Sequence, residues 1–113
     1  MSVIIKRIYE DSAKSDGFRV LVDRLWPRGV SKEKAALDLW LKEVAPSPNL
    51  RTWFGHKPER FAEFSAKYKD ELEQNPAVPG LRDIIKKNDT VTLLYAARDP
   101  KINHAAVLKD YLT

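Results

Sequence analysis

The chain has 113 residues, 43% hydrophobic and 32% charged, with a formal net charge of +4, which is the composition of one globular domain spanning residues 1–113. It has no cysteine, which excludes disulfides and thiol-based catalysis, and no long apolar run or typical signal peptide, so we expect a cytoplasmic protein without a membrane partner. The basic residues are spread along the chain, so the sequence permits nucleic-acid binding without indicating it.

The N-terminal region predicts two strands separated by a polar turn. Residues 3–9 place apolar side chains on both faces of a strand, and residues 11–17 form the turn. Residues 18–25 are apolar and rich in β-branched side chains, and Gly17 and Pro27 bound them. This pattern predicts a buried central strand that ends in a shaped loop, since proline fixes a backbone torsion.

The next segment predicts a short helix and then an ambiguous apolar run. Ser31 can cap a helix that ends at Lys34 or Ala36. Residues 37–44 alternate as a strand does, but their apolar side chains also fit one face of a helix. We prefer a strand here, because the run is short and Pro46 ends it.

The middle of the chain predicts two helices and a loop. Ser47 and Pro48 are typical of an N-cap followed by a proline in the first turn, which opens a helix through about Phe54. Pro58 opens a longer amphipathic helix, and residues 75–80 form a loop that contains proline. The apolar side chains of the longer helix recur at three- and four-residue steps: Phe61, Phe64, Tyr68 and Leu72.

The C-terminal region predicts a helix, a strand and a last helix. A short helix with apolar side chains on one face ends near Asn88. Residues 90–95 are apolar on both faces and predict a strand, which a turn over residues 96–100 follows. Asn103 or a neighbour caps the last helix.

Strands that alternate with helices predict an α/β domain. We expect a three-layer sandwich, with a small, mostly parallel sheet of about four strands and helices on both faces, because the strands with continuous apolar runs need cover on both sides. In such sheets ligands bind outside the carboxyl ends of the strands, so this edge is where we expect a functional site.

Polar side chains follow three of the predicted strands, and the parallel arrangement predicts that they share one sheet edge. They are Asp23, Arg24, Trp26, Arg28, Ser47, Tyr95, Arg98, Asp99, Asn103 and His104. Arginines and helix N-termini both favour anions, so the sequence predicts an anionic ligand bearing phosphate or carboxylate. In the alternative interpretation, Asp23 forms an internal salt bridge with Arg24 or Arg28. Arg98 and Asp99 then form a second one.

The histidines and tryptophans each have a structural and a functional interpretation. His56 could cap a carbonyl or stack on Trp53, or it could act as an acid/base group. His104 could be a satisfied, half-buried side chain of the last helix, or part of the site. Two distant histidines without cysteine predict no metal site, and nothing predicts a cofactor. Trp26, Trp40 and Trp53 could form a stacking platform, or they could pack in the core.

The segment Arg19–Glu33, reading Arg-Val-Leu-Val-Asp-Arg-Leu-Trp-Pro-Arg-Gly-Val-Ser-Lys-Glu, carries a family resemblance. The chain resembles the small YeaO-like proteins, a branch of the bacterial and archaeal domain-of-unknown-function 488 family, over nearly its whole length. The other matching residues are Trp40 with Lys42–Ser47, Leu50-Arg51, Trp53–His56, then Phe64, Tyr68, Glu71 and Leu72, and finally Thr92–Asp99 and Asn103–Ala105. The resemblance implies no established activity.

Other branches of that family end the last strand with cysteine and open the last helix with Cys-His-Arg. Here the matching positions are Tyr95 and, roughly, Asn103-His104-Ala105, so the histidine is kept and both thiols are absent. The thiol or metal chemistry of those branches therefore does not transfer to this chain. The absence of cysteine likewise excludes the sulfur transfer of rhodanese-like domains, whose strand–loop–helix order is similar.

We expect a monomer or a homodimer. Three functions are compatible with the candidate residues. The first is a domain that binds a small anionic ligand without chemistry. The second is a hydrolase or transferase, with Asp23 or Asp99 as general base and His104 or His56 as acid/base partner. The third is a nucleic-acid-binding accessory domain. The candidate ligand-binding residues are Arg24, Trp26, Arg28, Ser47, Arg51, Trp53, Tyr95, Arg98 and Asn103.

Overall fold

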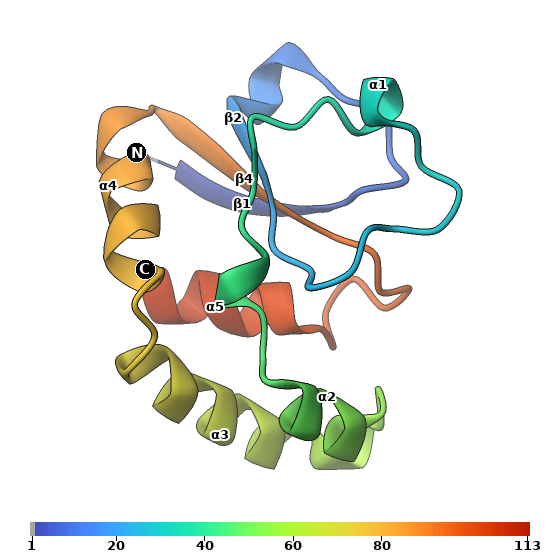
Figure 1. Ribbon diagram of the computed structural model, residues 1–113, viewed down its shortest axis with the longest axis vertical. Coiled ribbons are helices and arrows are strands. Elements are labelled where there is room, and N and C mark those ends of the chain that lie inside the picture. The colour runs from blue at the N-terminus through green and yellow to red at the C-terminus, as the bar shows by residue number, and fades with distance from the viewer. Residues whose placement is uncertain (1) are drawn as a thin grey trace.

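The computed structural model describes residues 2–113, which contain one parallel sheet of four strands (Figure 1). The strands are β1 (Ser2–Arg7), β2 (Phe18–Leu21), β3 (Leu39–Trp40) and β4 (Thr90–Tyr95). Their order is β1-β4-β2-β3, and every neighbouring pair is parallel. Because β2 and β4 are adjacent, the segments that follow them leave the sheet side by side.

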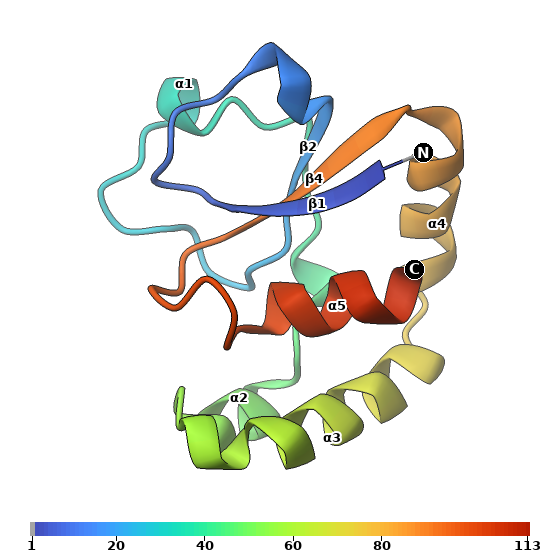
Figure 2. The same cartoon turned by 180° about the vertical axis from the view of Figure 1, so that it is seen from behind.

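Five α-helices and three short 3-10 helices connect the strands. The α-helices are α1 (Lys32–Ala35), α2 (Pro48–Phe54), α3 (Phe61–Glu73), α4 (Val78–Lys87) and α5 (His104–Leu112). The 3-10 helices are Lys14–Asp16, Lys42–Val44 and Pro58–Arg60. Helix α5 lies between the sheet and α3 (Figure 2). Within residues 2–113, no helix combines the length and the apolar character that crossing a membrane requires.

The two faces of the sheet pack against different elements. On one face, strand residues such as Val20 and Leu93 join a large core with side chains of α2, α3, α4 and α5, including Phe64 and Tyr68. On the other face, Leu21 and Leu94 pack with Val30, Ala35 of α1, and the indoles of Trp26 and Trp40. The predicted α/β class with a parallel four-stranded sheet is confirmed, and the two cores fit a three-layer sandwich.

Local sequence patterns located most elements correctly. The predicted strand over residues 90–95 is confirmed at both ends. Each predicted N-cap accepts a hydrogen bond from the backbone N–H three residues later, at 3.1 Å for Ser31, 3.3 Å for Ser47 and 2.8 Å for Asn103. These caps satisfy N–H groups that have no partner inside their helices.

The strands predicted over residues 18–25 and 37–44 are shorter in the structure. The central strand ends at Leu21, because Asp23 turns toward the loop after β4. The third strand has two residues, Leu39–Trp40, and the chain then turns into the 3-10 helix that ends at Val44. The preference for a strand in this run was therefore right only at its centre.

The predicted loop over residues 75–80 and the helix start at Pro58 also differ from the structure. Helix α4 already begins at Val78, so Pro79 and Gly80 lie in its first turn, where a proline costs no hydrogen bond. Pro58 opens a 3-10 turn, and the α-helix itself begins at Phe61.

Candidate functional site

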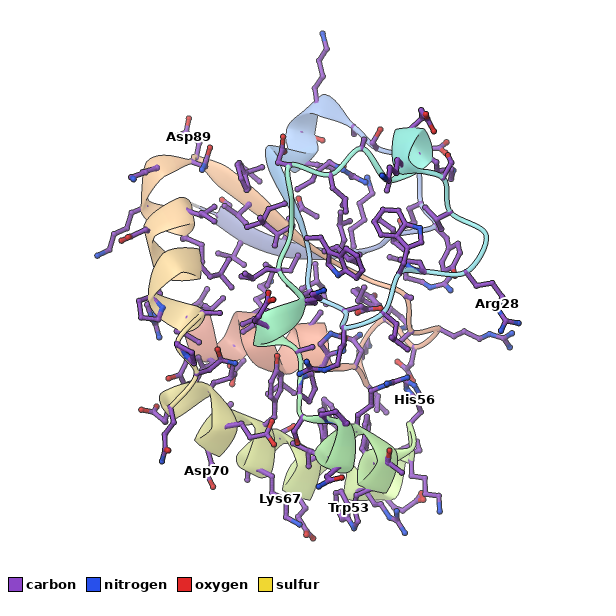
Figure 3. The ribbon with its side chains drawn as sticks, in the orientation of Figure 1. Arg28, Trp53, His56, Lys67, Asp70 and Asp89 are labelled. Atoms are coloured by element: carbon purple, nitrogen blue, oxygen red, sulfur yellow. The ribbon has the colours of Figure 1, made fainter. Side chains whose placement is uncertain are left out.

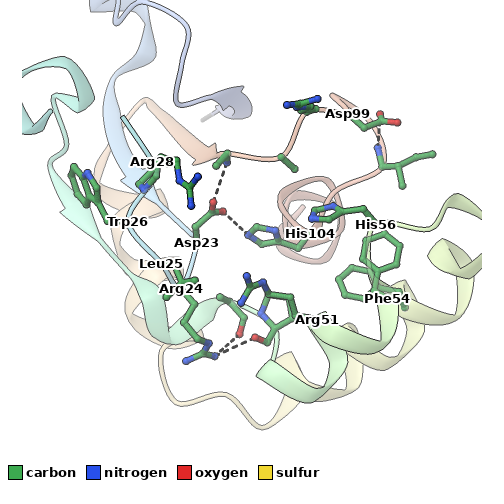
Figure 4. Close-up of a pocket in the computed structure, with 18 residues that line it drawn as sticks. Asp23, Arg24, Leu25, Trp26, Arg28, Arg51, Phe54, His56, Asp99 and His104 are labelled. Carbon is green, nitrogen blue, oxygen red and sulfur yellow. Dashed lines mark hydrogen bonds and ion pairs between the residues drawn. The ribbon is translucent and has the colours of Figure 1, made fainter. Parts of the chain in front are cut away.

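A cleft of about 610 Å³ lies at the carboxyl ends of β2 and β4 (Figure 4). Its walls come from the loop after β2, from α2 with the segments flanking it, and from the segment between β4 and the start of α5. It brings together these predicted candidates: Asp23, Arg24, Trp26, Arg28, Arg51, His56, Arg98, Asp99 and His104. The volume lies within the usual range for small-molecule sites.

Asp23 joins three elements at the centre of the cleft. Its Oδ2 accepts a hydrogen bond from the backbone N–H of Ala96 at 3.0 Å, and its Oδ1 lies 3.1 Å from Nε2 of His104. The carboxylate therefore connects the end of β2 to the loop after β4 and to the first residue of α5. Within residues 2–113 it forms no ion pair with Arg24 or Arg28.

The surroundings of His104 fix the position of its proton. Nε2 lies 3.1 Å from the carbonyl oxygen of Val22 and 3.1 Å from Oδ1 of Asp23. A carbonyl oxygen can only accept, so Nε2 carries a hydrogen, and in the neutral form of the ring the lone pair is then on Nδ1. No side chain or backbone group in residues 2–113 hydrogen-bonds to Nδ1. The half-buried ring packs edge-on against Tyr68, with centroids 6.3 Å apart.

Arg24 connects the loop after β2 to the start of α2. Its Nη2 donates to the carbonyl oxygens of Ala45 and Pro46, at 3.2 Å in both cases. Its Nε is buried and has no hydrogen-bond partner in residues 2–113. Arg24 thus shapes one wall of the cleft through Nη2, and its buried Nε stays without a partner among the residues that the structure describes.

The two tryptophans near the cleft are held by backbone carbonyls. The indole N–H of Trp26 donates to Val30 at 2.7 Å, and that of Trp40 donates to Asp23 at 2.8 Å. The rings meet edge to face with centroids 5.4 Å apart. They support the loop after β2 from the smaller core, which packs Leu21 and Leu94 against Ala35 of α1. Of the two, only Trp26 lines the cleft.

Three exposed arginines line the cleft from three different segments: Arg28, Arg51 and Arg98. Within residues 2–113, none of their side chains takes part in an ion pair, a hydrogen bond or a cation–π contact. The cleft lining holds four arginines and two aspartates, which leaves a formal excess of two positive charges. Figure 3 shows the Arg28 side chain extending outward from its loop.

Asp99 does not neutralise these arginines. Its Oδ1 accepts hydrogen bonds from the backbone N–H groups of Ile102 at 3.0 Å and Lys101 at 2.9 Å. These two bonds hold the pKa of Asp99 below its usual range. The Arg98–Asp99 ion pair of the alternative interpretation does not form within residues 2–113, and Asp99 instead shapes the turn into α5.

His56 reaches the cleft through an unusual backbone conformation. Gly55 ends α2 with a φ of 53°, and His56 follows with a φ of 58°. Two successive left-handed residues reverse the chain and place the exposed imidazole at the cleft, 5.9 Å from the Phe54 ring (Figures 3 and 4). Histidine tolerates this region better than bulky or β-branched residues do, but it is still disfavoured there.

Ser47 does not face the cleft, and the N-terminus of α2 is already occupied. The hydroxyl of Ser47 donates to Oε2 of Glu71 at 2.6 Å, and its backbone N–H donates to Oε1 at 2.9 Å. A carboxylate from α3 thus takes the place that the sequence analysis gave to a ligand anion.

Three other candidates also lie outside the cleft. Asn103 is 1% exposed and, besides capping α5, donates from Nδ2 to the carbonyl of Asp99 at 2.8 Å. Tyr95 is 2% exposed, and burial raises its pKa. Trp53 lies on the outer side of α2, between Arg60 and Lys67 (Figure 3).

One residue that the sequence analysis missed holds the cleft in shape. Arg7, the last residue of β1, donates from Nε to the carbonyl of Ala97 at 2.8 Å and from Nη2 to that of Ala96 at 3.2 Å. It could have been suspected, because β1 must end at the same sheet edge as its parallel neighbour. No group of three or more potential metal ligands is found in residues 2–113.

The chain resembles known proteins along nearly its whole length. Residues 2–113 match the family model described as the inactive DUF488-N3 subclade. The uncharacterised protein YeaO of Escherichia coli (strain K12) is 46% identical over 113 residues, which cover 99% of this chain and 97% of that protein. An uncharacterised protein of Mycobacterium tuberculosis (strain ATCC 25618 / H37Rv) is 44% identical over 110 residues, covering 97% and 92%. No solved structure matches the chain.

Proposed function

The chain belongs to the DUF488 family, as its sequence resemblance predicted, and from that premise we propose that its cleft binds a small anion and catalyses no reaction on it. The observation that carries this proposal is the group of uncommitted arginines Arg28, Arg51 and Arg98 around one cleft. Guanidinium groups bind phosphate and carboxylate through paired hydrogen bonds, so the ligand bears one of these groups. The subclade's description as inactive agrees with binding without catalysis.

The other arginines at this edge show what a structural arginine looks like in this protein. Arg7 and Arg24 each donate to two carbonyl oxygens, which fixes a loop in both cases. Folding alone gives no reason to gather three further cations that bind nothing, because like charges in one cleft repel each other. An anion in the cleft would remove that repulsion.

Calorimetric titration with inorganic phosphate tests the proposal. In the variant R28Q/R51Q/R98Q we expect affinity at least about tenfold weaker than in the wild type, because charge-assisted hydrogen bonds contribute about 1.5–3 kcal/mol each. The matched control is K14Q/K32Q/K87Q, which removes the same charge from exposed positions outside the cleft. The control should bind phosphate like the wild type. Equal losses in both variants would mean that only net charge matters, which contradicts a site.

A second candidate function is a hydrolase, and the contact between Asp23 and His104 favours it. Oδ1 of Asp23 lies 3.1 Å from Nε2 of His104, which is within reach for an acid/base pair, and the Nε2–H that bonds to the Val22 carbonyl leaves Nδ1 able to accept a proton. Hydrolysis of p-nitrophenyl phosphate separates the two candidates. We expect no turnover by the wild type. Turnover that H104Q abolishes would replace the binding function with the catalytic one.

A further inference from the structure

The most exposed large apolar side chain in residues 2–113 lines the cleft. Leu25 is 61% exposed, whereas Ile4 and Tyr9, the next in exposure, are each at 37%. A single exposed leucine needs no explanation on an ordinary surface. Leu25, however, lies on a cationic cleft and directly between two anchored residues, Arg24 and Trp26.

Those two anchors make Leu25 a rigid part of the wall. Arg24 is held by the carbonyls of Ala45 and Pro46, and Trp26 is held by the carbonyl of Val30. The backbone on both sides of Leu25 is therefore fixed, although its side chain contributes little to the core. Ligand binding to a wall that is already ordered loses less conformational entropy of the protein than binding to a mobile wall does.

The cleft continues the apolar surface that Leu25 begins. Its lining also includes Ala97 and Ile102, which are both half-buried. Phe54 and Phe64 form the floor behind this lining: they stack with centroids 4.2 Å apart and are 4% and 1% exposed, so Leu25, Ala97 and Ile102 offer most of the accessible apolar surface. The cleft thus combines exposed guanidinium groups with an apolar wall, and Figure 4 shows Leu25, Phe54 and the labelled charged residues around it.

Resting on the anion-binding function above, we propose that the cleft selects organic anions whose phosphate or carboxylate is attached to an apolar group, and that Leu25 contacts that group. The arginines bind the acidic part of such a molecule. The apolar part covers Leu25 and the other accessible apolar side chains of the lining, which removes apolar surface from water. Inorganic phosphate and polyhydroxylated phosphates gain only the first of these interactions.

Titration with three phosphates tests this selectivity: inorganic phosphate, glycerol 1-phosphate and phenyl phosphate. We expect phenyl phosphate to bind the wild type about tenfold more tightly than the other two, which corresponds to about 1.4 kcal/mol. Leu25→Ala should weaken phenyl phosphate binding about fivefold and leave inorganic phosphate unchanged, because only apolar contact area is lost. Ile4→Ala, which shortens an exposed aliphatic side chain outside the cleft, is the matched control and should change neither affinity.

The outcomes separate this inference from the function on which it rests. Equal affinities for inorganic and phenyl phosphate would overturn the selectivity and leave the anion-binding function standing. Tighter binding of phenyl phosphate that Leu25→Ala and Leu25→Ser both leave intact would overturn the role of Leu25. Failure of all three phosphates to bind would overturn the anion-binding function and, with it, the selectivity.

Discussion

Two groups of arginine and aspartate side chains flank β2, and they differ in how their guanidinium groups are paired. In the first group, Arg19 is 4% exposed and donates to the carboxylate of Asp16 and to the carbonyls of Ala35 at 2.8 Å and Ala36 at 3.1 Å. Lys6 adds a further contact to Asp16 at 3.1 Å. In the second group, at the cleft, Arg28, Arg51 and Arg98 are exposed and their side chains are uncommitted within residues 2–113.

The comparison separates a structural ion pair from a candidate ligand site within one small domain. Arg19 donates to the carbonyls of Ala35, in α1, and of Ala36, and it pairs with Asp16. Its guanidinium is therefore fully engaged in contacts that stabilise the fold. Arg28, Arg51 and Arg98 fix nothing in residues 2–113. Residue type is the same in both groups, and burial and pairing are what differ. Substitutions should therefore change stability in the first group and ligand binding in the second.

The largest expected effect is on stability and comes from Arg19→Met. Removing one partner of a buried ion pair leaves Asp16 with Lys6 as its remaining counter-charge and leaves the carbonyls of Ala35 and Ala36 without their donor, and we expect the free energy of unfolding to fall by about 3–5 kcal/mol. Urea denaturation measures this loss. The matched substitution Arg98→Met should change stability by less than about 0.5 kcal/mol. Similar losses in both variants would abolish the distinction between the two groups.

A smaller loss of stability is expected at the point where the cleft is attached to the sheet. Asp23→Ala leaves the backbone N–H of Ala96 without its acceptor, which should cost about 1–3 kcal/mol in urea denaturation. Asp23→Asn keeps an oxygen for this N–H and should lose less. If the two variants are equally unstable, the contact to Ala96 is not what Asp23 contributes.

The stability that the first group contributes should also depend on pH, through the carboxyl group of Asp16. Burial raises the pKa of Asp16, but the hydrogen bonds from the Ala13 N–H, Lys6 and Arg19 outweigh it and hold the pKa below the ordinary 3.8. A carboxyl group with a lowered folded-state pKa stabilises the protein above its unfolded pKa, and this stability is lost as pH falls through the folded value. We expect the urea concentration at the midpoint of unfolding to decrease as the pH is lowered below about 4. Asp16→Asn should flatten that fall, and an unchanged slope would contradict the assignment.

The smallest expected effect is a gain in stability at the cleft. His56→Gly relieves a left-handed histidine, and we expect stabilisation of up to about 1 kcal/mol by thermal or urea unfolding. Phosphate affinity should stay the same or fall, because an imidazole at the cleft is lost. A loss of stability would show that the His56 side chain makes contacts worth more than its backbone strain.

The sequence predicted the features that depend on neighbouring residues. The caps at Ser31, Ser47 and Asn103 are contacts between residues three apart, and the strand over residues 90–95 is a continuous apolar run. These patterns also predicted the parallel sheet and the edge where the cleft lies. Two residues of the run over 37–44 form a strand, because only they find a ladder partner in β2.

The partner of each charged side chain was not predictable, because it depends on contacts distant in sequence. Glu71 occupies the N-terminus of α2 from 24 residues away, and Arg7 reaches Ala96 across 89 residues. Arg24 was expected to bind the ligand, and its Nη2 instead donates to two backbone carbonyls. Nucleic-acid binding, a cytoplasmic location and the oligomeric state stay predictions.

Arginine side-chain NMR during a phosphate titration tests the central claim most directly, because it reports on both groups in one sample. We predict saturable shifts of the Nε–Hε resonances of Arg28, Arg51 and Arg98, with one dissociation constant of about 1 mM or lower, and no shift for Arg19. Weak, non-saturable shifts spread over all exposed arginines, or no shift of the three cleft arginines, would show that the cleft binds no anion.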